Sequence, residues 1–246
     1  SIVEYIKKSK GIVIVYSKYI DAGVIPVAIA LESEGYTRYK AKNLLNDNNN
    51  KNKRKYEYTI ISGDSKLTPS KESVISTIRS YENRNGDLIK IVIISQVATE
   101  GVDFKNVREI HLLEPWFNMS KVEQIVGRGV RRYSHINLPS DERNTTIYLH
   151  ANTIPKLHDK ESVDLRMYRI SEIKQQKISQ IERILKEGSV DCNLNKNVLY
   201  FDKDTINKKI SITTSQNTKI DNLRLGDTDN SKLCDFQNCK IECIPK

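Results

Sequence analysis

The sequence is poor in several features that define large classes of proteins. Its 246 residues include only four cysteines, too few for a chain of this size to depend on disulfides, so a reducing compartment is expected. No apolar run approaches the roughly 18 residues of a membrane span, and no charged-then-apolar signal segment opens the chain. These absences argue against a membrane-spanning protein and against a small disulfide-stabilised secreted domain.

A further absence concerns nucleotide chemistry. The sequence contains no Gly-x4-Gly-Lys-Ser/Thr motif and no Asp-Glu-x-His or Asp-Glu-Ala-Asp box. Those elements bind the phosphates of a nucleoside triphosphate and its magnesium ion. The chain by itself is therefore not expected to hydrolyse ATP.

Positive charge, in contrast, is in excess. Lysine and arginine number 40 against 31 aspartates and glutamates, a formal net charge of +9. Such a balance favours a polyanionic partner through counterion release. The alternative is a compositional bias toward Lys, Asn, Ile and Tyr, so charge alone does not establish nucleic-acid binding.

Apolar runs alternate along the chain with patterns of helical period, which predicts an α/β fold with a mainly parallel sheet. The expected strands are residues 12–16, 58–61, 91–94, 109–113 and 145–149. The expected helices are residues 21–34, 70–83, 121–131 and 161–186. Residues 46–55 are polar, basic and without period, and predict a surface loop that is either a basic finger over nucleic acid or a tolerated insertion.

The segment from Gln124 to Arg131 places Gln124, Arg128 and Arg131 at i, i+4 and i+7. On a helix these three side chains share one face. Guanidinium forks donate paired hydrogen bonds to phosphate oxygens, so two of them on one face suit a triphosphate. A solvated basic face is the alternative interpretation.

The start and the glycines of this helix also carry information. Ser120 followed by Glu123 fits a capping box that would begin the helix. Gly127 and Gly129 each weaken a helix by roughly 1 kcal/mol relative to alanine. Close packing beside a nucleotide would explain them, with a tight helix–sheet contact as the alternative.

Upstream, residues 90–104 form an apolar run that breaks into small polar residues and a Gly-x-Asp. The run predicts a strand buried on both faces. Loops at the carboxyl ends of parallel strands are where open α/β sheets bind ligands. Gly101 would let backbone approach a ligand there, and Asp103 could accept a hydrogen bond from a ribose hydroxyl.

Taken together, these segments resemble the second RecA-like lobe of superfamily 2 helicases and translocases over roughly residues 10 to 150. The matching segments, in family order, are residues 11–17 (motif IV), 61–65, 95–103 (motif V) and 124–131 (motif VI). Ser95 stands where threonine is common, and Glu100 where arginine is frequent. Residues 114–118 and 131–135 resemble helicases of large cytoplasmic DNA viruses, such as the poxvirus early transcription factor small subunit and nucleoside triphosphate phosphohydrolase I.

The resemblance implies a RecA-like lobe at residues 1–150, with helices on both sides of the sheet, and a largely helical extension at residues 151–246. It also implies functional residues. The arginine fingers would be Arg128 and Arg131. The residues that contact the nucleotide would be Gly101, Asp103, Gln124 and Gly127. The nucleic acid, expected to be DNA more than RNA, would be contacted by Ser17, Gly63 and Ser95.

ATP and Mg²⁺ would then be held mainly by a first RecA-like lobe in the same full-length chain, so this chain would be the C-terminal half of a motor. A viral transcription complex is an expected partner, and the host cytoplasm or virion interior the expected location. Two alternatives remain open: a non-catalytic module that binds nucleic acid or transcription proteins, and a remodelling translocase that moves on duplex without separating strands.

The extension contains all four cysteines, which are Cys192, Cys234, Cys239 and Cys243. Reduced structural cysteines are expected, with a tetrahedral Zn²⁺ site as the alternative. A broken apolar stripe over residues 163–185 predicts either docking onto the preceding lobe or a partner-binding helix. Trp116, the only tryptophan, is expected to be a packing anchor, with base stacking as the alternative.

Overall fold

The computed structural model describes residues 2–45, 56–96, 101–153, 161–199, 207–214, 217–224 and 229–244. The basic insertion at residues 46–55 and the motif V residues 97–100 lie outside these ranges. The chain divides into two compact units, the first formed by residues 1–116 and 120–167, the second by residues 117–119 and 168–246. The domain boundary expected at residue 150 stays a prediction.

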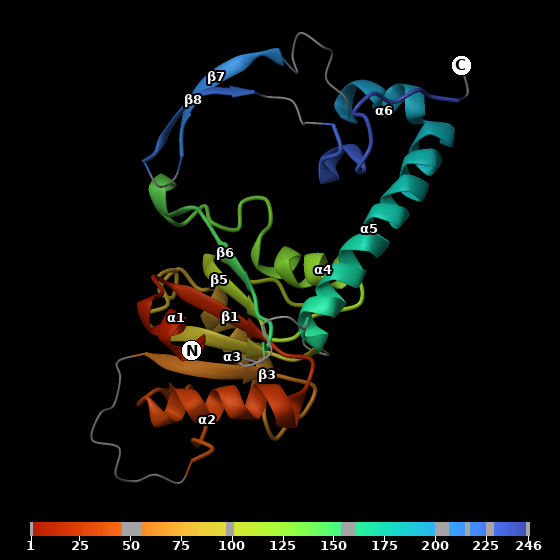
Figure 1. Cartoon of the computed structure of the whole chain (residues 1–246). Helices are drawn as coiled ribbons and strands as arrows, with labels where there is room; N and C mark the ends of the chain where they lie inside the picture. The colour runs from red at the N-terminus through yellow and green to blue at the C-terminus, as the bar shows by residue number, and fades with distance from the viewer. Residues whose placement is uncertain are drawn as a thin grey trace. The chain divides into compact units, whose positions relative to one another are not determined.

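The first unit is built on a six-stranded sheet in the order β2-β3-β4-β1-β5-β6 (Figure 1). Every neighbouring pair of strands is parallel. The strands are β1 (Ile12–Tyr16), β2 (Thr37–Arg38), β3 (Glu57–Ile61), β4 (Ile89–Ile94), β5 (Val107–Leu112) and β6 (Thr146–Leu149). The expected α/β class and RecA-like architecture are confirmed, because all five expected strands lie in this parallel sheet.

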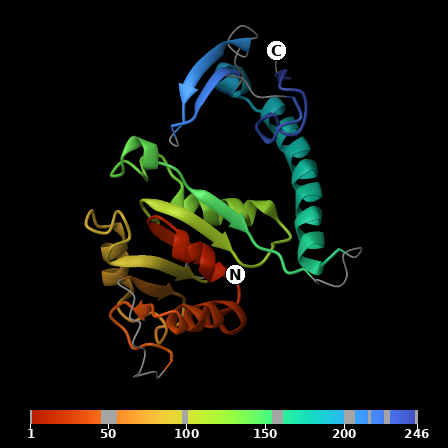
Figure 2. The ribbon, with the colours of Figure 1, turned by 60° about the vertical axis from the view of Figure 1, so that its left-hand side comes forward.

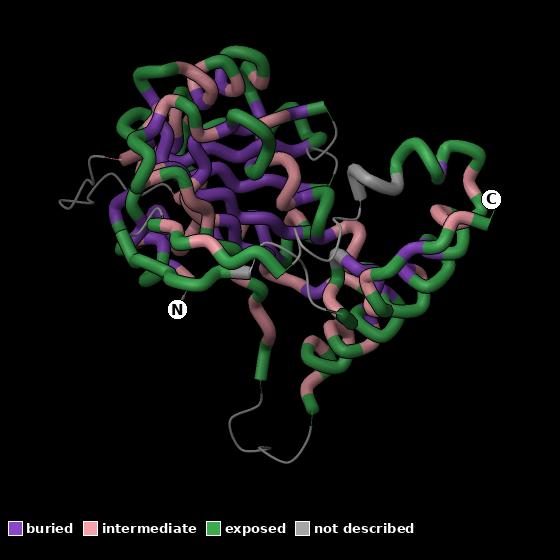
Figure 3. Tube along the Cα trace, turned by 90° about the horizontal axis from the view of Figure 1, so that it is seen from above, coloured by how far each residue is buried: buried purple, intermediate pink, exposed green. Residues whose placement is uncertain are grey.

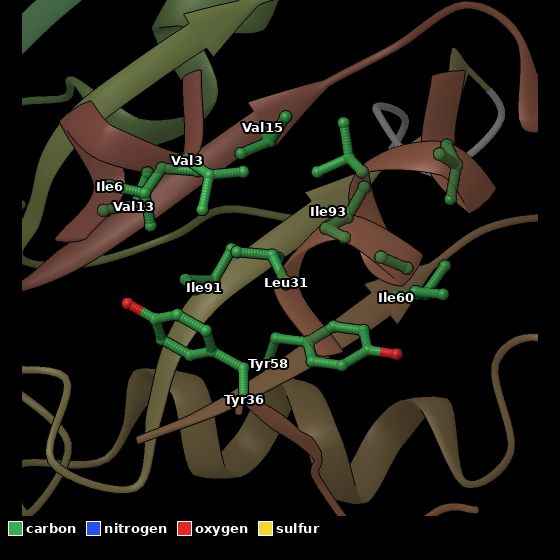
Figure 4. Close-up of a cluster of buried hydrophobic side chains, with 13 residues drawn as sticks. Val3, Ile6, Val13, Val15, Leu31, Tyr36, Tyr58, Ile60, Ile91 and Ile93 are labelled. Carbon is green, nitrogen blue, oxygen red and sulfur yellow. The ribbon is translucent and has the colours of Figure 1, made fainter. Parts of the chain in front are cut away.

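Helices lie on both faces of the sheet. They are α1 (Ile2–Lys8), the π-turn η1 (Ile20–Val24), α2 (Ile25–Ser33), α3 (Lys71–Arg79), α4 (Met119–Gly129) and the 3₁₀ turn η3 (Ser140–Glu142). Figure 4 shows the core beneath α1 and α2, a cluster of buried side chains to which Val13 and Val15 of β1 and Leu31 of α2 belong. Ile14 points to the opposite face because side chains alternate along a strand, and its register partner Ile110 packs against α4.

The two central strands explain why this sheet forms. All residues of β1 and β4 are buried, and both strands consist mostly of valine and isoleucine. β-Branched side chains favour the extended backbone, and parallel strands covered on both faces need unbroken apolar runs. Figure 3 shows the buried residues concentrated in the strands of this sheet.

The second unit contains a β-hairpin as well as the helices expected of the extension. Its elements are most of α5 (Val163–Gly188), α6 (Cys192–Leu199), the antiparallel hairpin β7 (Lys209–Thr213) and β8 (Lys219–Arg224), and the 3₁₀ turn η4 (Lys232–Cys234). Helix α5 runs unbroken for 26 residues (Figure 2). None of the described helices is both long and apolar enough to cross a membrane.

The buried side of α5 is polar. Arg183 is almost fully buried, and its guanidinium donates to the Asp235 carboxylate at 2.9 Å and to the carbonyls of Cys234 and Lys240 at 2.8 and 2.9 Å. Lys186 adds a second ion pair to Asp235 at 2.7 Å. This network ties the C-terminal segment to the helix, whereas apolar residues of the expected stripe, such as Ile184, are exposed.

The expectation of reduced cysteines is wrong for this structure. Cys192 is bonded to Cys243 with 5.7 Å between Cα atoms, and Cys234 to Cys239 with 4.8 Å. The fold brings together residues whose pairing sequence spacing does not reveal. With all four sulfurs in disulfides no thiolate is left for Zn²⁺, and no group of three or more metal-binding side chains occurs among the described residues.

Candidate functional site

Both arginines of motif VI converge on Asp103. The Arg131 guanidinium lies 2.7 Å from Oδ2 of Asp103, and that of Arg128 lies 3.6 Å from Oδ1. The side chains of Arg131 and Asp103 are 49% and 44% exposed, so this ion pair faces solvent. The structure therefore joins the Gly-x-Asp and the arginine motif, which are separate in sequence, into one surface cluster.

The two arginines do not lie on one helical face, as was expected. Helix α4 ends at Gly129, so Arg131 is not on the helix. Instead it folds back, and its Nε donates to the carbonyl of Gly127 at 2.9 Å. A basic side chain often caps the last carbonyls of a helix in this way. The backbone N–H of Phe104 also donates to the carbonyl of Arg128 at 2.8 Å, which holds the Asp103 segment against the helix end.

The expected capping box is also misplaced. Helix α4 begins at Met119, which puts Ser120 inside the first turn. An N-cap residue must precede the helix and have a non-helical backbone. The position before the helix belongs to Asn118, so sequence spacing placed the helix start two residues too late.

Sequence reasoning missed Arg79. Its Nε donates to the carbonyl of Asp103 at 2.7 Å from the last turn of α3. Arg79, Gly101 and Val102 line a cavity of about 530 Å³, together with residues of α3 and Ser80. Arg79 thus holds the turn that presents Asp103. In the sequence Arg79 was only one basic residue within the helix expected at residues 70–83.

The three glycines of the cluster serve different purposes. Gly101 has φ +75°, and apart from its chain neighbours no atom of the described residues lies within 4 Å of the position that a Cβ would take. The same position at Gly127 is also open. At Gly129, however, a Cβ would lie 3.1 Å from Ile110 and 3.3 Å from Val107. The helix–sheet explanation is therefore right for Gly129, while Gly101 and Gly127 leave bare backbone at the surface. Gln124, one turn before Arg128, is exposed.

Ser17, Gly63 and Ser95 form a second group, at the carboxyl ends of β1, β3 and β4. Backbone hydrogen bonds join Ser17 to Ile94 and Ser95 to Ile61, each at 3.1 Å. Gly63 is exposed. Ser95 is buried, and its hydroxyl has no hydrogen-bond partner among the described residues.

The Asp103 cluster does not share this edge. Asp103 lies against the C-terminal end of α4, and Gly129 in that last turn packs on Val107, the first residue of β5, and on Ile110. For Asp103 the expected position at the carboxyl edge is therefore wrong. Strand β4 ends at that edge with Ile94, whereas Asp103 shortly precedes Val107, the first residue of β5.

Ser17 is turned into the lobe. Its hydroxyl donates to Oε1 of Glu114 at 2.6 Å, and the backbone N–H of Lys18 donates to Oε2 at 3.0 Å. Gly23 makes this possible, because a Cβ there would lie 1.8 Å from the Ser17 hydroxyl. A phosphate contact from the Ser17 side chain would have to break these bonds, and it stays a prediction.

Trp116 lies beside the same carboxylate. The ammonium groups of Lys18 and Lys121 lie 5.0 and 6.0 Å from its ring centre, within the range of cation–π attraction. Burial raises the pKa of Tyr16 to about 12, the indole of Trp116 opposes the rise, and the Glu114 carboxylate adds to it. These contacts favour the packing role expected for Trp116.

Comparison with known proteins identifies the family of the chain. A family model described as the helicase conserved C-terminal domain matches residues 1–133, more than half of the chain. A predicted helicase of Invertebrate iridescent virus 3 is 28% identical over 232 residues, which are 93% of this chain and 21% of the relative.

Two further viral relatives are similar. A predicted ATP-dependent RNA helicase of Acanthamoeba polyphaga mimivirus is 34% identical over 197 residues, 80% of this chain and 32% of the relative. Nucleoside triphosphatase I of Heliothis armigera entomopoxvirus is 31% identical over 170 residues, 68% of this chain and 26% of the relative. The chain spans less than two fifths of the length of the curated relatives it matches first. The chain belongs to the helicase conserved C-terminal domain family, as the sequence motifs predicted.

Proposed function

We propose that this chain is the second lobe of an ATP-dependent nucleic-acid helicase or translocase and supplies the arginine fingers of the motor. The observation that carries the proposal is the convergence of Arg128 and Arg131 on a solvent-facing Asp103 beside Gly101. In this mechanism the lobe closes on ATP held by a first lobe. The two guanidiniums then stabilise charge on the transferring phosphoryl group.

Such a role requires Arg131 to exchange Asp103 for a phosphate. An ion pair as exposed as this one contributes only about 0–1 kcal/mol. A bidentate contact between arginine and phosphate is stronger, because the guanidinium fork matches the geometry of two phosphate oxygens. The ion pair with Asp103 therefore orients Arg131 in the open state without preventing its transfer to the nucleotide.

The surroundings of the cluster suit a nucleotide. Oδ1 of Asp103 accepts no hydrogen bond among the described residues, but it is shielded from solvent and lies 3.6 Å from the Arg128 guanidinium. It would accept a hydrogen bond from a ribose hydroxyl once Arg128 turns toward the phosphates. The bare backbone at Gly101 and Gly127 leaves room for close approach by a ligand. Gln124, exposed one helical turn before Arg128, completes the proposed nucleotide-contacting set.

Nucleic acid would bind at the other group, the carboxyl edge of the sheet. Gly63 offers exposed backbone there, and Ser95 has a hydroxyl without a partner among the described residues. Donors of this kind position a strand by its phosphates and carry no sequence information. Because the nucleotide and the nucleic-acid strand would bind at separate sites, closure of the lobe on ATP could change its affinity for the strand.

ATP and Mg²⁺ would be held mainly by the first lobe, since no phosphate-binding loop occurs in this sequence. This chain alone is then inactive as an ATPase. One relative is named as a homologue of a termination factor, which supports a place in viral transcription. The proposed location is the host cytoplasm or the virion interior. The proposal favours DNA over RNA as the nucleic acid that the motor binds.

The test is nucleic-acid-stimulated ATP hydrolysis by the full-length protein that contains both lobes. Arg131→Ala should lower turnover by roughly 10³-fold, the contribution of arginine fingers in related motors. Arg132→Ala is the matched control, because Arg132 is exposed and donates only to the Tyr133 hydroxyl at 3.0 Å among the contacts described. Turnover within a few-fold of wild type in Arg131→Ala would remove Arg131 from the finger role.

The second candidate is a helicase-like module that binds nucleic acid or transcription proteins without hydrolysis. The pairing of both arginines with Asp103 inside their own lobe favours it, because a purely structural role needs no further partner. If the full-length protein binds nucleic acid but neither wild type nor Arg131→Ala hydrolyses ATP, this module is the correct assignment. A strand-displacement assay beside the ATPase assay would separate a helicase from a translocase on duplex.

A further inference from the structure

A cavity of about 450 Å³ opens in the first unit among the segments that precede three of its parallel strands. Its lining comes from Ser9 to Gly11 before β1, from Tyr56 before β3, and from the region of β4. That region supplies Arg84, Asn85 and Asp87 before the strand and Lys90 within it. Arg108 at the start of β5 completes one wall. None of the residues of the Asp103 cluster lines it, so it is distinct from the proposed nucleotide site.

Two buried polar groups in this lining lack partners. The Ser9 hydroxyl and Nε of Arg108 are both shielded from solvent and make no hydrogen bond among the described residues. Ser9 as a whole is only 7% exposed. A buried donor without a hydrogen-bond acceptor destabilises the folded state, so such groups need an explanation. A guanidinium Nε–H can only donate, which means that its missing partner is an acceptor.

The charge of the lining favours an anion. Four cations face or border the cavity, against the carboxylates of Asp87 and Glu142. The cations are Lys10, Arg84, Lys90 and Arg108. Lys90 is buried and fixed, since its ammonium donates to the Ser9 carbonyl at 2.8 Å and lies 4.6 Å from the centre of the Tyr56 ring. Arg108 is held more loosely, at 3.4 Å from Glu142 and 3.3 Å from Asn144.

Two glycines set the position of Arg108 in the wall. Gly11 has φ +110°, and a Cβ there would lie 2.7 Å from Cγ of Arg108. Gly86 has φ +75°, and its Cβ position lies 3.1 Å from the carbonyl carbon of Gly11. Side chains at either position would push the wall apart. The absence of a side chain at Gly11 thus lets the aliphatic part of Arg108 pack against the backbone just before β1.

We propose that this cavity binds a small phosphate ester of the size of a sugar phosphate or nucleoside monophosphate. The phosphate would accept hydrogen bonds from Ser9 and from Nε of Arg108, with Lys10 at the mouth. The carboxylates of Asp87 and Glu142 would accept hydrogen bonds from hydroxyl groups of the sugar. The volume lies within the range of about 300–1,000 Å³ typical of small-molecule sites.

The experiment is calorimetric titration of this chain carrying Arg131→Gln, which removes a phosphate-binding group at the other site. The probes are inorganic phosphate, ribose 5-phosphate, adenosine monophosphate and a 5′-phosphorylated oligonucleotide. Ribose 5-phosphate and the monophosphate should bind with similar affinity and more tightly than phosphate alone. Preference for the oligonucleotide over both would overturn the assignment of a small ester and identify a nucleic-acid end as the ligand.

Variants decide whether the cavity is responsible. Lys10→Glu and Ser9→Ala should each weaken ribose 5-phosphate binding by about tenfold or more. Lys42→Glu, the same charge change at an exposed lysine outside the lining, should leave binding unchanged. Equal loss in Lys10→Glu and Lys42→Glu, or no binding of any probe at millimolar concentration, would overturn the proposal. Neither result bears on Arg131→Ala in the full-length protein, so the two proposals fail separately.

Discussion

Gly127 and Gly129 are two residues apart on one helix, yet the structure gives them opposite surroundings. A Cβ at Gly127 would meet open space, whereas one at Gly129 would meet Ile110 and Val107 at 3.1 and 3.3 Å. In the sequence both were simply helix-weakening residues. Whether a glycine is needed for packing depends on what lies beside it, which only the tertiary structure shows.

Alanine substitutions should therefore separate the two glycines. Gly127→Ala should stabilise the chain by up to about 1 kcal/mol, because alanine has the higher helix propensity. Gly129→Ala should destabilise it by about 1–3 kcal/mol, since an added methyl group overpacks the contact with β5. Chemical denaturation of the two variants beside wild type measures both changes.

The two variants are also each other's control. If Gly127 presents backbone to a nucleotide, Gly127→Ala should raise the KM for ATP of the full-length protein while it raises stability. A stabilised variant with unchanged KM would exclude Gly127 from the nucleotide-contacting set. Destabilisation by both substitutions alike would contradict the packing difference.

At the scale of elements, β5, β6 and the residue after β6 share a cluster of histidine, glutamate and tyrosine side chains. His111 is fully buried, with Nδ1 2.9 Å from Nε2 of His150 and Nε2 3.1 Å from the Glu109 carboxylate. The ring of Tyr148 stacks on His111 at 4.6 Å, and Tyr5 of α1 packs on Tyr148 at 5.3 Å. The cluster thus joins the edge strand and a helix to the central sheet.

This cluster makes stability depend on pH. Burial, followed by the neighbouring His111, lowers the pKa of His150 below its ordinary value of 6.5. As pH falls below 6.5 the unfolded chain binds a proton at this position before the folded chain does. The stabilisation of the folded state is therefore complete above pH 6.5 and decreases as pH falls toward the folded pKa.

His150→Gln should remove part of this dependence. We expect the Tm of wild type to fall between pH 7.5 and 5.5, and the Tm of His150→Gln to fall less over the same range. Scanning calorimetry at matched ionic strength measures both. Identical slopes for the two proteins would show that other groups cause the acid sensitivity.

At the scale of the whole molecule, the two units differ in how they are stabilised. The first unit contains no cysteine and rests on its apolar sheet. The second unit holds both disulfides and the Arg183 network. Closing loops of these sequence separations, 51 and 5 residues, stabilises by about 4 and about 2 kcal/mol respectively.

Reduction should therefore act on one unit. We expect dithiothreitol to increase amide hydrogen exchange in α6 and residues 229–244, and to leave exchange in β1 and β4 unchanged. The double variant Cys192→Ser/Cys243→Ser should reproduce most of the effect, and Cys234→Ser/Cys239→Ser less of it. Unchanged exchange in the second unit after reduction would contradict a stabilising role for the disulfides.

The sequence predicted those elements that depend on local residue patterns and missed those that depend on contacts between distant segments. The strand expected at residues 12–16 is β1, and the strand expected at residues 91–94 forms most of β4, because a buried strand needs a local apolar run. The two-residue strand β2 and the hairpin of the second unit were not predicted. Short strands depend on their partners rather than on their own sequence.

The sequence by itself determined the family, the parallel α/β core and the identity of the motif residues Asp103, Arg128 and Arg131. These follow from local spacing and residue type. Only the tertiary structure decided where the motifs meet, because that depends on contacts between distant segments. It turned Ser17 inward, brought Arg79 to Asp103 and joined Cys192 to Cys243.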